Sequence, residues 1–447
     1  MTVRRAAVLA AAALTAAACA GGTAPAKPTG PPSPTPQNLG VVVDEAPSLR
    51  PLPLGREPLW TQDTKGAVKY ISAAALHGDA AVIVGGLRKK ETRLVVADAA
   101  TGKVRWSVGE FGPLRGGGGA VWLDMAYGRS RTPQIVGKGA DWGILANYYL
   151  TGCRHPTGLC PLGSGPSDET GVALLSGRDG SVRWRLPLVP ARTGRAARAA
   201  NRLRGVLETS GGKIALATVA PSPTGGFGDV RLVAVDVATG RRLWTRSGVQ
   251  PVMVSGDLVL GRVAGGTGGS RLDLGGGSVV ALDAATGRTR WEPSPRMPAS
   301  LPALAAGNLP MVREVKDGRL GPPLVLDPGT GREIARLPEF VTGCQTDGVS
   351  LIACEYSDLR QRRLVTIRLD GREVRVARRE LPDATLAAVW RGHVFLDDRH
   401  DRGYEVDRSA NVLADDLPGE PVALSEGYAI FQGRYSEMPG YSVHRVG

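Results

Sequence analysis

One short pattern recurs along the chain and limits what it can fold into. Four segments contain an apolar run, an Asp or Ser, a Gly four residues later and a Trp four residues after the Gly. They read LVVADAATGKVRW, VALLSGRDGSVRW, RLVAVDVATGRRLW and SVVALDAATGRTRW. Weaker copies without the Trp follow at residues 323–335 and 364–375. A chain with such a period is built from stacked copies of one structural unit.

Each copy predicts a β-hairpin. An apolar, β-branched run such as Ser278–Leu282 is typical of a buried strand. In the turn, the Asp carboxylate can accept hydrogen bonds from main-chain amides, and the Gly allows a positive φ. The returning strand carries the Trp, which we expect to pack between neighbouring sheets. The residues given these roles are Asp98, Gly102, Trp106, Gly180, Trp184, Asp236, Gly240, Trp244, Asp283, Gly287, Trp291, Asp327 and Gly331.

The spacing of the copies favours a propeller. Their glycines lie 78, 60, 47, 44 and 40 residues apart, so the late copies show the basic unit and the early ones carry insertions. A further strand precedes each hairpin, and several strands per unit of about 40 residues is typical of a propeller blade. The 61 Gly and 33 Pro residues disfavour a helical bundle.

Counting the units predicts a single all-β propeller with eight blades, which fits better than seven. Hairpin units are centred near residues 98, 176, 236, 283, 327, 367 and 404, and a last strand pair lies at 428–432 and 441–446. That pair lacks a Trp strand, which Leu59 and Trp60 can supply. The N- and C-terminal strands would then close the ring and remove the exposed sheet edges.

The pattern A-x-D-x-x-T-G-x-x-x-W, nearly complete at residues 234–244 and 281–291, resembles the tryptophan-docking repeat of the quinoprotein (PQQ-like) β-propellers. The resemblance covers about residues 60–447 and weakens after the fourth copy. This architecture includes dehydrogenases and non-catalytic scaffolds such as the propeller lipoprotein of outer-membrane β-barrel assembly. The dehydrogenases carry adjacent cysteines beside the quinone and a set of calcium ligands, and this chain has no Cys-Cys pair. The resemblance therefore implies a non-enzymatic scaffold without a cofactor, and a PQQ- and calcium-dependent oxidoreductase is the alternative.

The first residues predict export and a lipid anchor. Arg4 and Arg5 precede an apolar stretch, Ala6–Ala18, which is too short to span a membrane and is typical of a signal peptide. The small residues before Cys19 resemble the lipobox of bacterial lipoproteins, although Leu is usual where Ala16 stands. Ordinary secretion is the alternative. We expect the lipidated Cys19 to hold the protein at the outer face of the cytoplasmic membrane.

A tether is predicted between the anchor and the propeller. The segment that follows Cys19 is rich in Pro and shows no apolar periodicity, so we expect it to be extended and solvated. The predicted organisation is a signal peptide at 1–18, the lipidated Cys and tether at 19–58, and the propeller at 59–447.

The remaining cysteines predict two local disulfides. An odd number of cysteines in an exported protein needs an explanation, and lipidation of Cys19 supplies one. In an oxidising compartment, sequence proximity pairs Cys153 with Cys160 and Cys344 with Cys354. Zinc held by Cys153, His155 and Cys160 is a less favoured alternative because no fourth ligand lies nearby.

Two charged segments and the net charge indicate which metal ions or charged partners the protein could bind. A cation could meet Asp397, Asp398, His400 and Asp401, but this spacing matches no calcium loop and a solvated turn is favoured, so we predict no metal site. The net charge of +13 is compatible with anionic partners, but we do not expect nucleic acid. A basic run contains Arg192, Arg195, Arg198, Arg202 and Arg204, and it reads either as a docking surface or as an exposed loop.

The insertions locate the predicted binding function. We expect a monomer that binds an envelope protein or ligand transiently through the inserted loops Thr151–Thr170 and Arg192–Arg204, because both lie outside the repeating unit.

Overall fold

The computed structural model describes the chain between Gln37 and Gly447, with gaps. The described residues are 37–38, 41–43, 49–55, 57–62, 70–86, 92–109, 120–122, 133–150, 168–192, 202–210, 212–220, 230–264, 277–292, 299–300, 309–316, 319–339, 341–347, 350–357, 362–368, 373–381, 384–398, 403–433 and 441–447. By compactness the chain divides into residues 1–35 and 36–447, and all described residues belong to the second unit. In the described part, no helix has the length and apolar character needed to cross a membrane.

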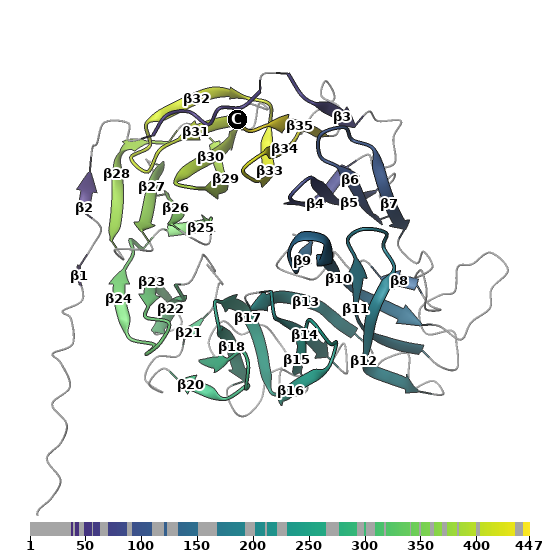
Figure 1. Cartoon of the computed structure of the whole chain (residues 1–447). Helices are drawn as coiled ribbons and strands as arrows, with labels where there is room; N and C mark the ends of the chain where they lie inside the picture. Colours follow the sequence, from purple (N-terminus) through teal and green to yellow (C-terminus); the bar gives the residue numbers. More distant parts are fainter. Residues whose placement is uncertain are drawn as a thin grey trace, which may run out of the picture. The chain divides into compact units, whose positions relative to one another are not determined.

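The strands form eight sheets arranged as the blades of a ring (Figure 1). Blade 1 contains β4 (Tyr70–His77), β5 (Ala80–Gly86), β6 (Thr92–Asp98) and β7 (Val104–Gly109). Blade 2 contains β8 (Ala120–Trp122), β9 (Gln134–Val136), β10 (Gly143–Leu150), β11 (Asp168–Ser176) and β12 (Val182–Arg192), with the short 3-10 helix η1 (Gly139–Asp141) before β10. Blade 3 contains β13 (Arg202–Ser210), β14 (Ile214–Ala220), β15 (Arg231–Asp236) and β16 (Arg242–Ser247). Blade 4 contains β17 (Val249–Ser255), β18 (Leu258–Ala264), β19 (Gly277–Asp283) and β20 (Thr289–Trp291).

The second half of the ring follows the same plan. Blade 5 contains β21 (Ala299–Ser300), β22 (Met311–Lys316), β23 (Arg319–Leu326) and β24 (Glu333–Arg336). Blade 6 contains β25 (Val341–Thr346), β26 (Leu351–Ser357), β27 (Arg362–Arg368) and β28 (Val374–Glu380). Blade 7 contains β29 (Ala384–Trp390), β30 (His393–Asp398), β31 (Gly403–Val406) and β32 (Val412–Leu417). Blade 8 contains β33 (Glu420–Leu424), β34 (Tyr428–Gln432) and β35 (Tyr441–Arg445).

The two ends of the chain close the ring in blade 8. Strand β3 (Trp60–Gln62) pairs antiparallel with β35, with Trp60 opposite Val443, and becomes the outermost strand of that blade. The prediction of an eight-bladed all-β propeller closed by its terminal strands is confirmed.

The core consists of eight apolar clusters, each between two neighbouring blades. On β5, Val82 and Val84 pack toward blade 2, whereas Ala81 and Ile83 pack toward blade 8. On β19, alternate residues likewise face blades 3 and 5. A middle strand is thus buried on both faces, which is why its sequence reads as an unbroken apolar run. The other clusters join the remaining neighbours in the same way.

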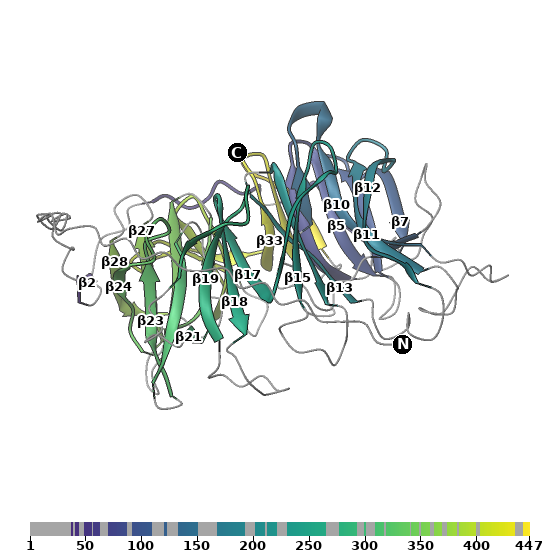
Figure 2. The same ribbon diagram turned by 90° about the horizontal axis from the view of Figure 1, so that it is seen from below.

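The two faces of the ring differ in their connections, because the strands run from one face to the other (Figure 2). We call the side that carries the turns after β6, β11, β15, β19 and β23 the hairpin face. The turns there are short: Gly240 donates its amide to the Asp236 carbonyl at 2.8 Å, and Gly287 donates to Asp283 in the same way. On the opposite face, Leu150 pairs with Glu169, Asp168 with Arg192 and Arg202 with Ala220. The chain enters and leaves residues 151–167, 193–201 and 221–229 from that face.

The segment before Trp60 departs from the predicted solvated tether. Strand β1 (Gln37–Asn38) pairs in parallel with β24, and β2 (Val41–Val43) pairs in parallel with β28. Leu52 is 8% exposed and belongs to the core cluster between blades 7 and 8. The prediction of an extended, solvated segment up to Pro58 is therefore wrong for these residues. The cause is tertiary: the outer strands β24 and β28 offer unpaired main-chain groups to any nearby extended segment.

One predicted disulfide lies in blade 6. Cys344 and Cys354 stand opposite each other on β25 and β26 and are joined, so the innermost strand is tied to the second strand. Cys153 and Cys160, with the alternative ligand His155, lie outside the described residues.

Candidate functional site

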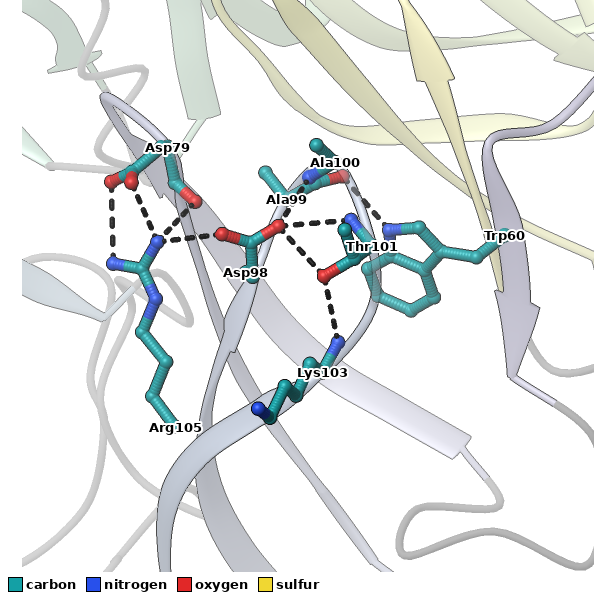
Figure 3. Close-up of polar contacts among 8 residues, drawn as sticks. All are labelled: Trp60, Asp79, Asp98, Ala99, Ala100, Thr101, Lys103 and Arg105. Atoms are coloured by element: carbon teal, nitrogen blue, oxygen red, sulfur yellow. Dashed lines mark hydrogen bonds and ion pairs between the residues drawn. The ribbon is translucent and has the colours of Figure 1, made fainter.

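At five joints of the ring, an indole joins one blade to the turn of the next. Each Trp donates its Nε1–H to the carbonyl of the residue that follows the Asp or Ser at the start of that turn. The bonds are Trp60 to Ala99 (2.8 Å), Trp106 to Gly177 (2.9 Å), Trp184 to Val237 (2.8 Å), Trp244 to Ala284 (2.8 Å) and Trp291 to Pro328 (2.8 Å). Figure 3 shows this contact, which we call a tryptophan dock, at Trp60.

Hydrogen bonds within the turn hold the accepting carbonyl in place. In blade 4 the Asp283 Oδ1 accepts from the amide and the hydroxyl of Thr286, both at 2.9 Å. The Thr286 Oγ1 in turn accepts from the Arg288 amide at 3.3 Å. The Asp-x-x-Thr-Gly sequence is therefore a self-contained turn whose polar groups are used locally.

In blade 2 the turn sequence differs, and the carboxylate that accepts hydrogen bonds from the turn stands at another position. Ser176 stands where the other turns have Asp, and the Asp179 Oδ1 accepts from the Ser181 amide at 3.0 Å and from its hydroxyl at 2.7 Å. These bonds, led by the one from the Ser181 amide, lower the pKa of Asp179 to about 2. The repeat pattern did not predict this substitute.

The glycine of each turn is required for two reasons, as Gly287 illustrates. Its φ is +69°, which side chains disfavour, and a methyl group there would lie 2.7 Å from the Trp244 ring. The glycines at the other four docks lie equally close to the incoming ring: Gly102, Gly180, Gly240 and Gly331. The structure therefore brings the predicted Asp, Gly and Trp residues together at the joints, with each Trp contacting the turn of the following blade.

A β-bulge precedes four of the five docked Trp residues, and the sequence pattern does not predict it. The register shifts by one residue just before Trp106, Trp184, Trp244 and Trp291, so that two residues of the outer strand oppose one of its neighbour. The extra residue re-aims the side chain that follows it. An Arg directly before three of these Trp residues is the only local sign of the bulge.

In blades 1 and 4 that extra residue links two turns of the hairpin face. Arg290 contacts the Asp257 carboxylate at 2.5 Å and the Asp283 carboxylate at 2.6 Å. Arg105 bonds Asp79 and Asp98 in the same way (Figure 3). The hydrogen bond from Arg290, followed by those from Thr286, holds the pKa of Asp283 below its usual value.

The predicted binding and metal segments lie only partly within the described residues. Strand β11 begins at Asp168, β12 ends at Arg192 and β13 begins at Arg202, so the edges of both insertions are strand rather than loop. Asp397 is buried on β30, whereas His400 and Asp401 lie outside the described residues. Where the structure is described, no group of three or more His, Cys, Asp and Glu residues is placed to hold a metal ion.

The dual role of the turn glycine gives a testable prediction. Gly287→Ala should cost about 2–4 kcal/mol of unfolding free energy, because it adds a clash with Trp244 to the backbone strain. Gly248→Ala is the matched control, since Gly248 has a φ of +73° but no atom near the new methyl group, and it should cost about 1 kcal/mol. Urea unfolding measures both. Equal losses would mean that the Trp contact does not constrain this position.

Acidification should weaken the turns. Because its pKa is lowered from 3.8, folded Asp283 binds a proton less readily than the unfolded chain does. Its stabilising contribution is therefore present above the unfolded value and is lost as the pH falls through the lower pKa of the folded state. Asp283→Asn should be less stable at pH 6 and lose less stability on acidification, as measured by urea unfolding at each pH. Asp416→Asn, at an exposed position of β32, controls for the change in net charge; parallel acid profiles for wild type and Asp283→Asn would contradict the assignment.

Comparison with known proteins finds a family model that matches the part of the chain with the strongest repeats. A family model described as outer membrane protein assembly factor BamB matches residues 164–292. No curated protein matches the sequence. Similar solved structures include BamB from Moraxella catarrhalis (12% identity, 84% of this chain and 96% of that chain, TM-score 0.42) and a europium-containing methanol dehydrogenase (12%, 87% and 85%, TM-score 0.45). Saccharomyces cerevisiae Sqt1 is another (11%, 87% and 100%, TM-score 0.45). Residues 164–292 of this β-propeller are thus similar to the family model of BamB.

Proposed function

We propose that this protein is a non-enzymatic scaffold that binds a protein or other ligand of the cell envelope. The observation that carries the proposal is that the polar residues of the repeat make hydrogen bonds that hold the propeller together. The turn carboxylates accept hydrogen bonds from their own turns, as at Asp236 and Asp283, and the five docked indoles bond main-chain carbonyls. What varies between units is the length of the connections, where binding residues of a rigid scaffold usually lie.

The connections of blades 2 and 3 are the proposed binding surface. The strand ends at Leu150, Asp168, Arg192 and Arg202 all lie on the face opposite the hairpins, and they bracket residues 151–167 and 193–201 of the two predicted inserted segments. The family model that matches residues 164–292 is that of an assembly factor, which supports a protein partner. We further propose that the protein acts as a monomer, without cofactor, metal or nucleic acid.

Replacing each insertion tests this proposal. Residues 151–167 and 193–201 would each be exchanged for a Gly-Ser linker of equal length, which spares the flanking strands. Either exchange should weaken, by roughly tenfold or more, the capture of envelope proteins by the purified protein, with the melting temperature unchanged. The matched control is residues 301–308, because Pro310 bonds Leu326 at the hairpin face. Equal capture by all variants would contradict the proposed surface.

The same preparation distinguishes a scaffold from an oxidoreductase. Incubated with PQQ and calcium, the protein should show neither stoichiometric quinone absorbance nor dye-linked oxidation of alcohols or sugars. Quinone binding with turnover on any alcohol would overturn the scaffold proposal and establish the alternative.

We also propose a signal peptide at residues 1–18 and a lipid anchor at Cys19, which would hold the protein at the outer face of the cytoplasmic membrane. Cys19→Ser should move the protein from the membrane fraction to the soluble fraction, because no acyl chain is added. Fractionation with immunodetection measures this, and Cys344→Ser controls for the loss of a cysteine elsewhere. A wild-type protein found free in the medium would contradict the anchor.

A further inference from the structure

Three consecutive joints of the ring are built without a tryptophan dock. The outer strand of blade 5 carries Ala335 at the position that Trp occupies in blades 1–4, and the corresponding copy in blade 6 carries Arg375. The outer strand of blade 7 reads VLADDL and also has no Trp. The joints between blades 5 and 6, 6 and 7, and 7 and 8 therefore lack the contact that holds the other five.

The described parts of the segment before Trp60 lie along blades 5, 6, 7 and 8 in that order (Figure 1). Strand β1 lies on the outer edge of blade 5 and β2 on that of blade 6. The chain then reaches blade 7, where Leu49 lies against Gly392. It continues into blade 8, where Leu54 pairs with Val446 and β3 pairs with β35.

A buried carboxylate fixes this segment to blade 7. Both oxygens of Glu405, which is 0% exposed, accept from the Leu52 amide, at 2.9 and 3.0 Å. The His393 Nδ1 lies 2.6 Å from the same carboxylate, so the charge has a second partner inside the blade. A carboxylate taken out of water requires such partners, which indicates that the attachment is a specific part of the fold.

The Leu52 side chain fills the last of the three joints. It packs in one cluster with Phe395 and Leu417 of blade 7 and with Phe431 and Val446 of blade 8. Leu52, which belongs to the N-terminal segment and to no strand of either blade, thus fills this joint. At a docked joint, the side chain in this role is an indole from the outer strand of a blade.

We infer that the described residues of this segment, 37–38, 41–43, 49–55 and 57–59, form a belt that replaces the missing docks and holds blades 5 to 8 together. The ring then has two mechanically different parts, one joined by indoles and one joined by the belt. The segment that connects the fold to residues 1–36 is consequently structural, and its displacement would loosen blades 6 and 7 before blades 1 to 4.

Proline substitution in β2 tests the belt in the full-length mature chain. Because adjacent residues of a strand bond in opposite directions, Val41→Pro with Val42→Pro removes at least one amide that pairs with β28. Hydrogen exchange of β25 and β29, the innermost strands of blades 6 and 7, is the readout, since the belt pairs with neither. Their exchange should become roughly tenfold faster, while that of β13 and β17 in blades 3 and 4 stays unchanged.

Two further variants complete the test. Ala26→Pro with Lys27→Pro, upstream of the belt, is the matched control and should leave exchange as in the wild type. Glu405→Gln, which keeps one acceptor but removes the charge, should speed exchange of β29 by a smaller factor. If the proline pair in β2 exposes only β28 itself, with β25 and β29 protected as before, the belt merely covers an edge and the inference is wrong. Equal acceleration in all blades would overturn it as well.

Discussion

The contact between a tryptophan ring and the glycine of the next blade's turn sets most of what this sequence must contain. The glycine must lack a side chain because the indole lies where a methyl group would be, as at Gly287 under Trp244. The carbonyl that accepts the indole N–H must be held in position, and the Asp and Thr of the turn do so. At four of the five docks, a bulge just before the Trp re-aims its side chain. Four sequence positions per repeat thus serve one contact.

Burial on both faces of the middle strands leaves little of each blade free for binding. Residues such as Val279 and Val280 pack against different neighbours, so neither can change without disturbing a joint. The longest stretch between consecutive strands, residues 151–167, follows β10 of blade 2. Because the packed middle strands leave little free surface, we place the proposed binding surface at the strand ends near Leu150 and Arg192.

The sequence predicts what is repeated and misses what tertiary context decides. The turn motif recurs often enough to count eight blades, and the absence of a Trp strand in the last blade points to Trp60 as its replacement. The bulges are invisible because they change the register of pairing and not the pattern of residue types. Strand β2 is missed because three apolar residues without alternation form a strand only where an outer edge such as β28 is open beside them. For the binding site, the sequence indicated only the inserted segments Thr151–Thr170 and Arg192–Arg204, because no repeated chemistry marks a ligand. The face on which the flanking strands end follows from the strand pairing.

Blade 7 shows which sequence requirements of the turn change at a joint without a tryptophan dock. Its turn keeps a carboxylate at its start, since the Asp407 Oδ1 accepts from the amides of Ser409 and Asn411 at 2.8 and 3.0 Å. Ala410 nevertheless adopts a φ of +62°, in the place where the docked turns have glycine. Its side chain lies in the apolar cluster between blades 6 and 7, a joint that has no tryptophan dock. Positive φ alone therefore does not demand glycine in this fold, because its strain of about 1 kcal/mol can be offset by burial. Glycine is required where a Trp ring packs against the turn. At a joint held by the belt no tryptophan dock is present, so another residue is allowed.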